Sequence, residues 1–339
     1  MNVLVTGGAG YIGSHTVVEL IKAGHNAIIV DDLSNAKAEV VDRIETITGI
    51  RPVFYQMDCK DKEGLRSVFS QNQIDAIIHF AAFKAVGESV TDPMKYYRNN
   101  LTSFLNVLEL MREEGRANVV FSSSATVYGE ADELPVTELT PRKPATSSYG
   151  NTKQICEDIL RDVATAYGDV KGISLRYFNP IGAHPSALIG ELPRGVPQNL
   201  VPFVTQTAAG VRECLSVFGD DYPTPDGSCL RDYIDVVDLA KAHVVAITRM
   251  VEGKNKQPYE VFNVGTGNSV SVKELLASFE RVNGVKVNHK IAPRRAGDVM
   301  AIWADTTLAN EELGWRAERS LDETLQSAWA WEKNVRGIK

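Results

Sequence analysis

The segment SSYGNTK, residues 147–153, places a phenol and an ammonium four residues apart, at Tyr149 and Lys153. On a helix this spacing puts two side chains on one face, with Cβ atoms roughly 5–6 Å apart. A free tyrosine has a pKa of about 10, and lowering it by about three units requires roughly 4 kcal/mol of favourable interaction with the phenolate. A nearby ammonium is a suitable source. The pair is therefore a candidate acid/base group that takes a proton from a hydroxyl.

The same spacing occurs again at Tyr167 and Lys171, so it is not diagnostic by itself. The second copy contains Gly168 and precedes a predicted strand, so we expect it to straddle a helix end, where the two side chains need not share a face. The first copy follows Ser124, which we place near the end of the strand that begins at Val119. Ser124 could relay a proton or donate to the phenol oxygen, or it could cap the loop at the strand end.

A glycine-rich segment, VTGGAGYIG at residues 5–13, lies between the first predicted strand and the first predicted helix. Gly7, Gly10 and Gly13 allow a tight turn, close approach of the backbone to a pyrophosphate and close packing of helix on sheet. The helix amino terminus offers free N–H groups to the anion. Alone, such a motif could be a structural turn. Its place directly after a strand predicts a dinucleotide site.

Two carboxylates, Asp31 and Asp32, close the second predicted strand. A carboxylate there accepts hydrogen bonds from the adenosine ribose and repels a 2′-phosphate, so we predict NAD as the cofactor and Asp31 as its partner. Either aspartate could instead be a turn residue before Asn35. Asp58, after the third strand, could hold the adenine edge or be a turn residue. An oxidised nicotinamide would add positive charge near Tyr149.

These residues depend on a regular alternation of strands and helices. Short apolar, β-branched runs are typical of buried parallel strands, and they occur at residues 3–5, 27–30, 52–55, 76–80, 119–121 and 173–175. Segments with helical periodicity lie between most of them. The alternation implies right-handed crossovers, and so predicts an α/β fold with a doubly wound parallel sheet of the Rossmann type.

The character of the chain changes near Pro180. Residues 180–232 are rich in Pro and Gly, so loops and short elements are expected there, and strand-like runs return at 233–236 and 260–264. We predict an NAD-binding Rossmann domain over residues 1–180. Residues 181–339 are expected to form mainly a smaller, discontinuous carboxy-terminal lobe, with a segment at about 233–262 returning to the first domain.

The composition argues against several classes of function. The 339 residues are 44% hydrophobic with a net charge of −7, and Lys and Arg are scattered, which disfavours nucleic acid and membranes as partners. No apolar run approaches the ~20 residues of a spanning helix, and no basic leader precedes the first strand. The four cysteines and six histidines show no ligand spacing, so we expect no metal, no disulfide scaffold and a cytoplasmic location.

Three motifs together resemble the extended short-chain dehydrogenase/reductase family: GGAGYIG at 7–13, SSSATVYG at 122–129, and the Tyr149 and Lys153 pair. Five further segments resemble one branch of it, the UDP-galactose 4-epimerase family. They are FAAFKAVGES at 80–89, RYFNP at 176–180, FGDDYPT at 218–224, RDY at 231–233 and RRAGD at 294–298. The similarity runs essentially from end to end.

The resemblance implies that Tyr149 is the base, that Lys153 tunes it and binds the nicotinamide ribose, and that Ser124 assists. It implies an NAD site made of Gly7, Gly10, Tyr11, Ile12, Gly13, Asp31, Asn35, Asp58, Cys59, Phe80, Ala81, Lys84, Asn99, Ser122, Tyr149, Lys153, Tyr177 and Phe178. It implies a UDP-sugar site made of Ser124, Ala125, Thr126, Tyr149, Phe178, Asn179, Asn199, Leu200, Leu215, Phe218, Arg231, Tyr233, Arg295, Asp298 and Ile302. Two arginines suit a diphosphate, although either could be a solvated surface residue.

The implied reaction is oxidation at sugar carbon 4 by bound NAD, followed by return of hydride to the other face of the 4-keto intermediate. Such chemistry needs a firm hold on the nucleotide and a loose hold on the sugar, so that remote binding energy retains the intermediate. The resemblance also implies a homodimer that packs through helices near 95–114 and 150–167.

One position departs from the family pattern. Bacterial members often carry tyrosine directly before the tryptophan that follows the RRxGD segment, whereas Ile302 precedes Trp303 here. A smaller residue without a hydroxyl could leave room for a 2-acetamido group, which predicts that UDP-N-acetylglucosamine and its galacto epimer are also accepted. Alternatively, Ile302 is a packing residue without influence on the substrate.

Two rival functions are considered. A 4,6-dehydratase or decarboxylase of the same family needs an extra acid in the loop after the Val119 strand, and Ala125-Thr126 supplies none. A dinucleotide-sensing protein could keep the fold without catalysis. The intact set of Ser124, Tyr149 and Lys153 argues against the sensor.

Overall fold

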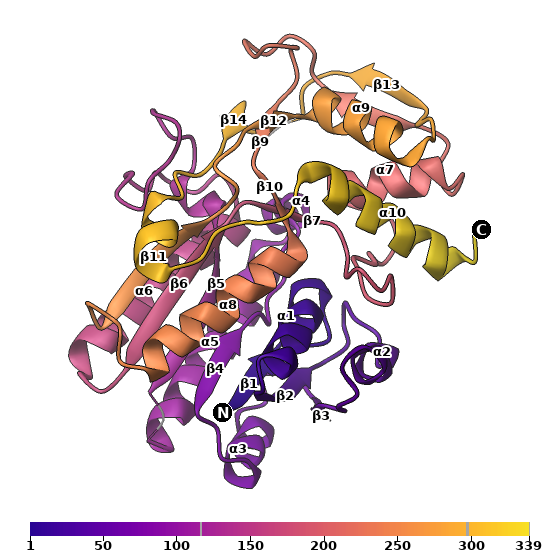
Figure 1. The fold of residues 1–339 in the computed structure, drawn as a ribbon. Helices are drawn as coiled ribbons and strands as arrows, with labels where there is room; N and C mark the ends of the chain where they lie inside the picture. Colours follow the sequence, from indigo (N-terminus) through magenta and orange to yellow (C-terminus); the bar gives the residue numbers. More distant parts are fainter. Residues whose placement is uncertain (116, 296–297, 339) are drawn as a thin grey trace.

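The computed structural model describes residues 1–115, 117–295 and 298–338. Its largest unit is a seven-stranded sheet in which all neighbouring strands are parallel (Figure 1). From one edge to the other the strands are β11 (Tyr259–Val264), β6 (Lys171–Tyr177), β5 (Asn118–Ser124), β4 (Ala76–His79), β1 (Asn2–Thr6), β2 (Asn26–Asp31) and β3 (Val53–Gln56). All six apolar runs predicted in the first half of the chain are strands of this sheet. The predicted doubly wound fold is confirmed.

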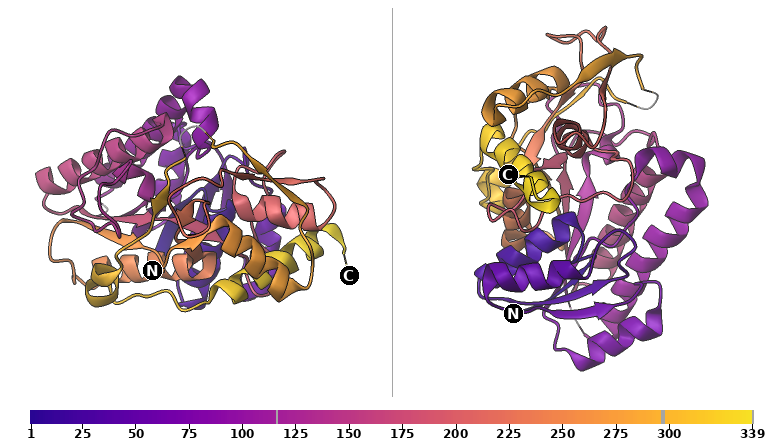
Figure 2. Two further views of the ribbon diagram at one scale, coloured as in Figure 1. Left: turned by 90° about the horizontal axis from the view of Figure 1, so that it is seen from above. Right: turned by 90° about the vertical axis from the view of Figure 1, so that its right-hand side faces the viewer.

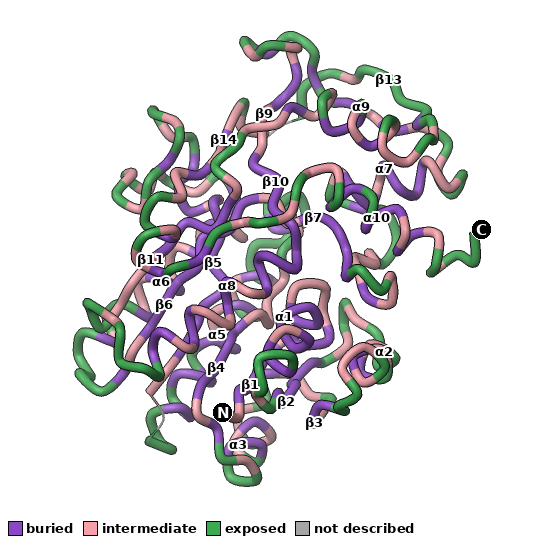
Figure 3. Tube along the Cα trace, viewed as in Figure 1, coloured by how far each residue is buried: buried purple, intermediate pink, exposed green. Residues whose placement is uncertain are grey.

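Helices cover both faces of the sheet. One face carries α1 (Tyr11–Lys22), α2 (Glu39–Thr48) and α8 (Val236–Val251); the other carries α3 (Lys62–Gln71), α5 (Pro93–Glu113) and α6 (Ser148–Ala166). Successive strand side chains point to opposite faces. Val3 and Val5 therefore join the apolar cluster under the first group, and Leu4 joins the cluster under the second. The central strands of the sheet are therefore buried on both faces (Figure 3).

The strand order reverses between β1 and β4, which are neighbours although two strands separate them in sequence. In open parallel sheets, ligands bind outside the carboxyl ends of the strands at such a reversal. The glycine segment follows β1 and the segment that begins at Phe80 follows β4. Both predicted cofactor segments therefore lie at the position that the topology favours.

A smaller lobe lies beyond the carboxyl edge of the large sheet (Figures 1 and 2). Its strands are β7 (Asn179–Ile181), β8 (Leu215–Phe218), β9 (Leu230–Arg231), β10 (Tyr233–Asp235), β12 (Val270–Ser271), β13 (His289–Ala292) and β14 (Ala301–Ile302). Its helices are α7 (Leu200–Ala208), α9 (Val272–Asn283) and α10 (Leu321–Arg336). Two short helices, α4 (Val86–Thr91) and η1 (Ala125–Tyr128), follow β4 and β5, and η2 (Ala309–Leu313) packs near β11.

The segment after β10 leaves this lobe. α8 packs against α1, and β11 adds the outermost strand beside β6. The boundary between two domains near residue 180 stays a prediction. Within the described part of the chain, no helix combines the length and apolar character that a membrane span requires.

Candidate active site

Tyr149 and Lys153 lie in the first two turns of α6. Ser147 caps this helix, because its Oγ accepts a hydrogen bond from the Gly150 N–H at 3.1 Å. The Lys153 Nζ lies 5.7 Å from the centre of the Tyr149 ring. The two side chains therefore share one face, as their spacing predicts.

The carboxyl end of β5 supplies the partners of this pair. The Lys153 Nζ donates to the Ser122 carbonyl at 2.5 Å and to its Oγ at 3.2 Å. Ser124 lies close enough to the Tyr149 hydroxyl to lower its pKa, and its Oγ accepts from the Thr126 N–H at 3.2 Å. The contact with Thr126 is the cap of the strand-end turn, and donation by Ser124 to the phenol stays a prediction.

The second copy of the spacing forms no such pair. Tyr167 is the C-cap residue of α6 and Lys171 begins β6. The Arg112 guanidinium lies 3.3 Å from the centre of the Tyr167 ring, while the Lys171 Nζ donates to the Met250 carbonyl at 3.2 Å. The helix end separates the two side chains, as predicted.

The electrostatics of the pair differ from the expectation of an acidic phenol. Burial raises the pKa of Tyr149 to about 12, and the hydrogen bond with Ser124 only partly opposes this. Burial lowers the pKa of Lys153 to about 8, against the negative charge of Glu157. The physical reason is that a phenolate in this site loses its water, while the ammonium is engaged by Ser122. The protein by itself does not make Tyr149 acidic.

The glycine segment leaves no room for side chains at two positions and opens a helix whose start no described side chain caps. Gly7 has a φ of +70°, and a Cβ there would lie 2.9 Å from the Ala81 backbone nitrogen. A Cβ on Gly13 would lie 2.2 Å from the Gly7 carbonyl oxygen. Gly10 is the N-cap of α1, and no described side chain caps that helix start. The segment fits a dinucleotide phosphate at the helix amino terminus.

The two aspartates at the end of β2 each accept from the backbone N–H two residues on, Asp31 from Leu33 at 2.9 Å and Asp32 from Ser34, and their roles toward a cofactor stay predictions. Asp31 is 8% exposed, and its Oδ2 accepts from the Ala9 N–H at 3.0 Å, which joins it to the glycine segment. Asp32 accepts from the Ser34 N–H at 2.8 Å, as a turn residue does. Burial raises the pKa of Asp31, with hydrogen bonds from Leu33 and Ala9 in opposition.

The other residues implied for NAD are dispersed around the same edge. Asp58 accepts from the Lys60 N–H at 2.8 Å, and Cys59 is buried, with its carbonyl bound by Asn106. The Asn99 amide donates to Asn100 at 3.2 Å. The remaining residues flank the carboxyl ends of strands β1, β2, β4, β5 and β6 and are Tyr11, Ile12, Asn35, Phe80, Ala81, Lys84, Tyr177 and Phe178.

Three residues implied for the sugar meet in one apolar cluster. Ala125, Phe178 and Ile302 pack together, each at most 8% exposed. Thr126 is beside them in sequence, and its buried Oγ1 finds no hydrogen-bond partner among the described residues. Ile302 thus adjoins the turn that carries Ser124.

The residues implied for the nucleotide lie in the small lobe. Arg295 makes two hydrogen bonds to Asp298, at 2.7 and 3.0 Å, and its guanidinium is 5.5 Å from the centre of the Phe218 ring. Tyr233 begins β10, two residues after Arg231, which ends β9. Of the remaining residues, Asn179 begins β7, Asn199 precedes α7, and Leu200 and Leu215 pack in the apolar core of the lobe. Ala296 and Gly297 of the RRAGD segment lie outside the described residues.

Sequence reasoning missed Glu191. Its Oε1 accepts from the Lys84 Nζ at 3.2 Å and from the Asn199 amide at 2.6 Å. It therefore joins a residue implied for the cofactor to one implied for the substrate. The three residues lie far apart in sequence or in a loop without periodicity, so no local pattern indicates the contact.

Comparison with known proteins places this geometry in a family. Residues 4–328 match the family described as GDP-mannose 4,6 dehydratase. A UDP-glucose 4-epimerase from Bacillus subtilis is 50% identical over 340 residues, which cover 100% of this chain and 99% of that protein. The chain belongs to the UDP-glucose 4-epimerases.

Solved structures agree with this assignment to the UDP-glucose 4-epimerases. One from Stenotrophomonas maltophila, with bound NAD and formylated UDP-arabinopyranose, is 47% identical with a TM-score of 0.96, and the match covers 100% of both chains. A UDP-Glc/GlcNAc 4-epimerase from Campylobacter jejuni is 36% identical with a TM-score of 0.84, over 98% of this chain and 99% of that one. The resemblance to the 4-epimerases of the extended short-chain dehydrogenases is confirmed.

Proposed function

We propose that the protein interconverts UDP-glucose and UDP-galactose by inverting sugar carbon 4, with NAD as a bound cofactor. The observation that carries this proposal is the group formed by Tyr149, Ser124 and Lys153. It lies at the same sheet edge as the glycine segment that fits a pyrophosphate. The family membership agrees with it.

NAD, when bound, would supply the hydride acceptor and donor that inversion at sugar carbon 4 requires. Tyr149 takes the proton of the 4-hydroxyl as the carbon–hydrogen bond breaks, and later gives a proton back to the 4-oxygen, so protons and electrons balance over the cycle. Ser124 hydrogen-bonds the phenol oxygen and orients it. Lys153, held by Ser122, presents its ammonium beside the phenol and to the nicotinamide ribose.

The phenol must gain acidity for this role. A shift of its pKa from about 12 to near 7 corresponds to about 7 kcal/mol of added preference for the phenolate. The Lys153 ammonium is engaged by Ser122 and is not sufficient. The positive ring of an oxidised nicotinamide would supply the further stabilisation of the phenolate, and Tyr149 would then act as the base.

The small lobe holds the nucleotide. Arg231 and Arg295 bind the diphosphate, Tyr233 and Phe218 pack beside the uridine moiety, and Asp298 accepts from a ribose hydroxyl. Charge-assisted pairs of this kind are roughly twice as strong as neutral hydrogen bonds. The sugar faces the mainly apolar cluster of Ala125, Phe178 and Ile302, where a 4-keto ring can turn.

The test uses the purified holoenzyme without added cofactor. We expect it to interconvert UDP-glucose and UDP-galactose, and to release NAD in near-stoichiometric amount after denaturation. Absence of either result contradicts the proposal.

A 4,6-dehydratase is the rival that the family description raises. Elimination from the keto-sugar needs its own acid/base group, and Ala125 and Thr126 provide only a methyl group and a hydroxyl after Ser124. We therefore expect a hexose product and no 4-keto-6-deoxy sugar. Mass spectrometry of the products distinguishes the two, because dehydration removes one water.

Acceptance of 2-acetamido sugars is a finer proposal for the same site. Ile302 packs against Ala125 and Phe178, and a tyrosine at this position would occupy more of the space proposed for the sugar. The Campylobacter relative is described as acting on Glc and GlcNAc substrates. We expect wild-type turnover of UDP-N-acetylglucosamine, and its loss in I302Y with UDP-glucose turnover retained. Wild-type inactivity on acetamido sugars contradicts the idea, and unchanged turnover in I302Y assigns Ile302 to packing alone.

We also propose a cytoplasmic homodimer. None of the four cysteines, all within the described residues, forms a disulfide, as a reducing compartment requires. Met94 and Leu105 on α5 are 56% and 41% exposed and lie on the helix pair proposed to pack in the dimer. Sedimentation at micromolar concentration should give twice the mass of the chain, and a monomer contradicts this.

A further inference from the structure

The face of α6 that carries the catalytic pair continues for a further turn. Tyr149, Lys153 and Glu157 follow one another at intervals of four residues, which aligns them on one face. Each contacts one of the serines that end β5, in the pairs Tyr149 with Ser124, Lys153 with Ser122, and Glu157 with Ser123. The helix therefore contacts the end of the strand at three points.

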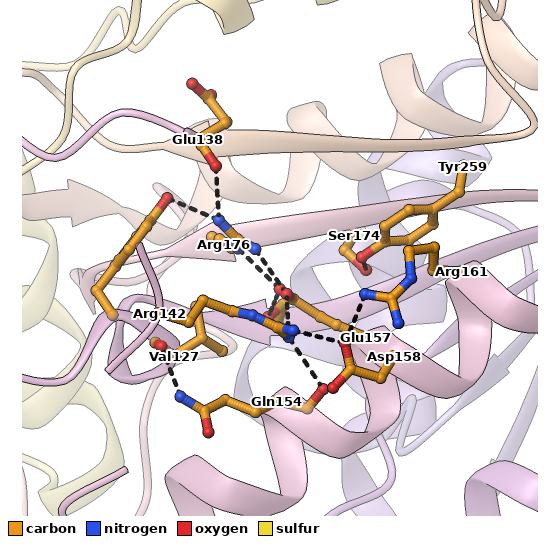
Figure 4. Close-up of polar contacts among 12 residues, drawn as sticks. Val127, Glu138, Arg142, Gln154, Glu157, Asp158, Arg161, Ser174, Arg176 and Tyr259 are labelled. Atoms are coloured by element: carbon orange, nitrogen blue, oxygen red, sulfur yellow. Dashed lines mark hydrogen bonds and ion pairs between the residues drawn. The ribbon is translucent and has the colours of Figure 1, made fainter. Parts of the chain in front are cut away.

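Glu157 is the buried end of this row, with 2% of its side chain exposed. Ser123 Oγ donates to its Oε1 at 2.5 Å. Arg176 donates to both oxygens, from Nε to Oε1 at 2.9 Å and from Nη2 to Oε2 at 2.7 Å (Figure 4). Paired bonds of this kind fix the orientation of a carboxylate as well as its position. Ser123 of β5 and Arg176 of β6 are paired residues of neighbouring strands. The sheet therefore binds the Glu157 carboxylate in one position.

The same arginine reaches the turn that follows β5. Its Nη1 donates to the Tyr128 hydroxyl at 3.1 Å. Gln154 of α6 donates to the Val127 carbonyl of that turn at 2.8 Å (Figure 4). The turn begins directly after Ser124, so one connected set of contacts holds both the helix with the phenol and the segment with the catalytic serine.

We propose that Glu157 is a positioning residue for the 4-epimerisation. Bound to Ser123 and Arg176, it sets the height and rotation of α6 at which Tyr149 meets Ser124. Its carboxylate lies inside the protein and acts through the catalytic side chains. A displacement of about 1 Å costs on the order of a hundredfold in rate when reacting groups must align. This inference rests on the proposed function.

The chain offers a matched control in Arg249 and Glu260. The Nε–Oε2 and Nη2–Oε1 distances of this pair are 2.8 and 2.9 Å, and each side chain is 8% exposed. The pair joins α8 to β11 and includes no residue of the site. An amide in place of either glutamate removes the charge that pairs with a similarly buried, doubly bonded arginine, and Glu157 Oε2 also lies 3.5 Å from Arg142 Nη1.

The experiment compares E157Q with E260Q as NAD-loaded holoenzymes. We expect both to unfold at lower temperature than the wild type. In E157Q, kcat should fall about 10- to 100-fold, with KM for UDP-galactose within about twofold and NAD retained. In E260Q, kcat should stay within about twofold. Equal kcat values in the two variants overturn the inference, whereas an inactive wild type overturns the proposed function instead.

The pH profile gives a readout that a purely structural role would not move. Burial lowers the pKa of Lys153 to about 8, and Cys156 and the Glu157 carboxylate oppose this; burial raises the pKa of the Cys156 thiol to about 12, so Glu157 supplies the charge in the assay range. Tyr149 on α6 and His79 on β4 also face it, and the pKa of His79 is lowered to about 3, outside the assay range. Removing the Glu157 charge should lower the pKa of Lys153, so kcat on the basic side of the pH profile should fall at a lower pH. E260Q should leave this part of the profile unchanged. An unchanged basic side of the profile in E157Q overturns the proposal.

If E157Q gives no folded holoenzyme, S123A tests the same contact between Glu157 and the sheet. It removes only the hydroxyl that joins Glu157 to β5 and leaves the ion pair with Arg176 intact. We expect kcat to fall about three- to tenfold at unchanged KM. An unchanged kcat in S123A then overturns the inference.

Discussion

The carboxyl edge of the large sheet and the small lobe hold their polar side chains in opposite ways. At the sheet edge, Ser124 and Lys153 are 8% and 5% exposed and are bonded to a strand or to the helix beside it. In the small lobe, the Arg295 side chain is 51% exposed and pairs with Asp298 three residues away. Exposed pairs of this kind contribute about 0–1 kcal/mol, so a ligand can displace them at little cost.

The buried side chains at the sheet edge and the exposed pair in the small lobe suit two different functions. Proton transfer needs reacting atoms at fixed separation, and burial between helix and strand provides that, although it opposes charge on the phenol. Anchoring a diphosphate needs strong cations that can exchange partners. We therefore expect substitutions at the sheet edge to lower kcat and substitutions in the small lobe to raise KM.

The largest expected effect concerns the acidity of Tyr149. With neutral, reduced nicotinamide its pKa should approach the value of about 12 that burial gives it, and with the oxidised ring it should lie near neutrality. Phenolate absorbance of the two redox forms against pH, with Y149F subtracted, measures the shift. Equal pKa values in both forms contradict the assignment of the charge to the cofactor.

Replacement of Tyr149 by phenylalanine should lower kcat by about 10²- to 10⁴-fold, because it removes the acid/base group and keeps the ring. The matched control is Y167F in the second copy of the spacing, which should retain wild-type activity. Bound NAD, measured after denaturation, should be unchanged in both. A Y149F variant with wild-type turnover breaks the catalytic assignment.

G13A should weaken retention of NAD by about 10- to 100-fold. The added Cβ would lie 2.2 Å from the Gly7 carbonyl oxygen and must displace the phosphate segment, a strain of about 1–3 kcal/mol. G168A is the control, because no described atom lies within 4 Å of its Cβ. NAD content after extended dialysis measures retention, and equal content in both variants contradicts the prediction.

R295K should have the smallest effect, a rise of about tenfold in KM for UDP-galactose with kcat within about twofold. Lysine keeps the charge and loses the paired geometry of the guanidinium. R294K is the control, since Arg294 pairs with Asp221 at 2.7 Å in the same exposed segment. A fall in kcat at unchanged KM in R295K would contradict the prediction that the small lobe acts on KM and the sheet edge on kcat.

The elements that local pattern determines were predictable. The strand runs, the glycine segment between β1 and α1, and the shared face of Tyr149 and Lys153 all follow from spacing over a few residues. The second copy at Tyr167 was correctly separated because Gly168 and the following strand mark the end of the helix. In each case the information lies within one or two turns of the chain.

Contacts between distant segments were not predictable in this way. Glu191 joins Lys84 to Asn199, and Arg176 of β6 meets Glu157 of α6, although no short motif connects these positions. The further contact of Asp31 with the Ala9 N–H, which Asp32 does not share, also required the tertiary structure.

The sequence by itself determined which chemical groups are present, their order along strand and helix, and hence the fold and the dinucleotide segment. The tertiary structure decided the environment of those groups. Tyr149 illustrates the division: its distance from Lys153 follows from helix geometry, but the direction of its pKa depends on how much water the whole fold excludes around the ring. Desolvation sums over neighbours from many segments, and no local pattern in the sequence contains that sum.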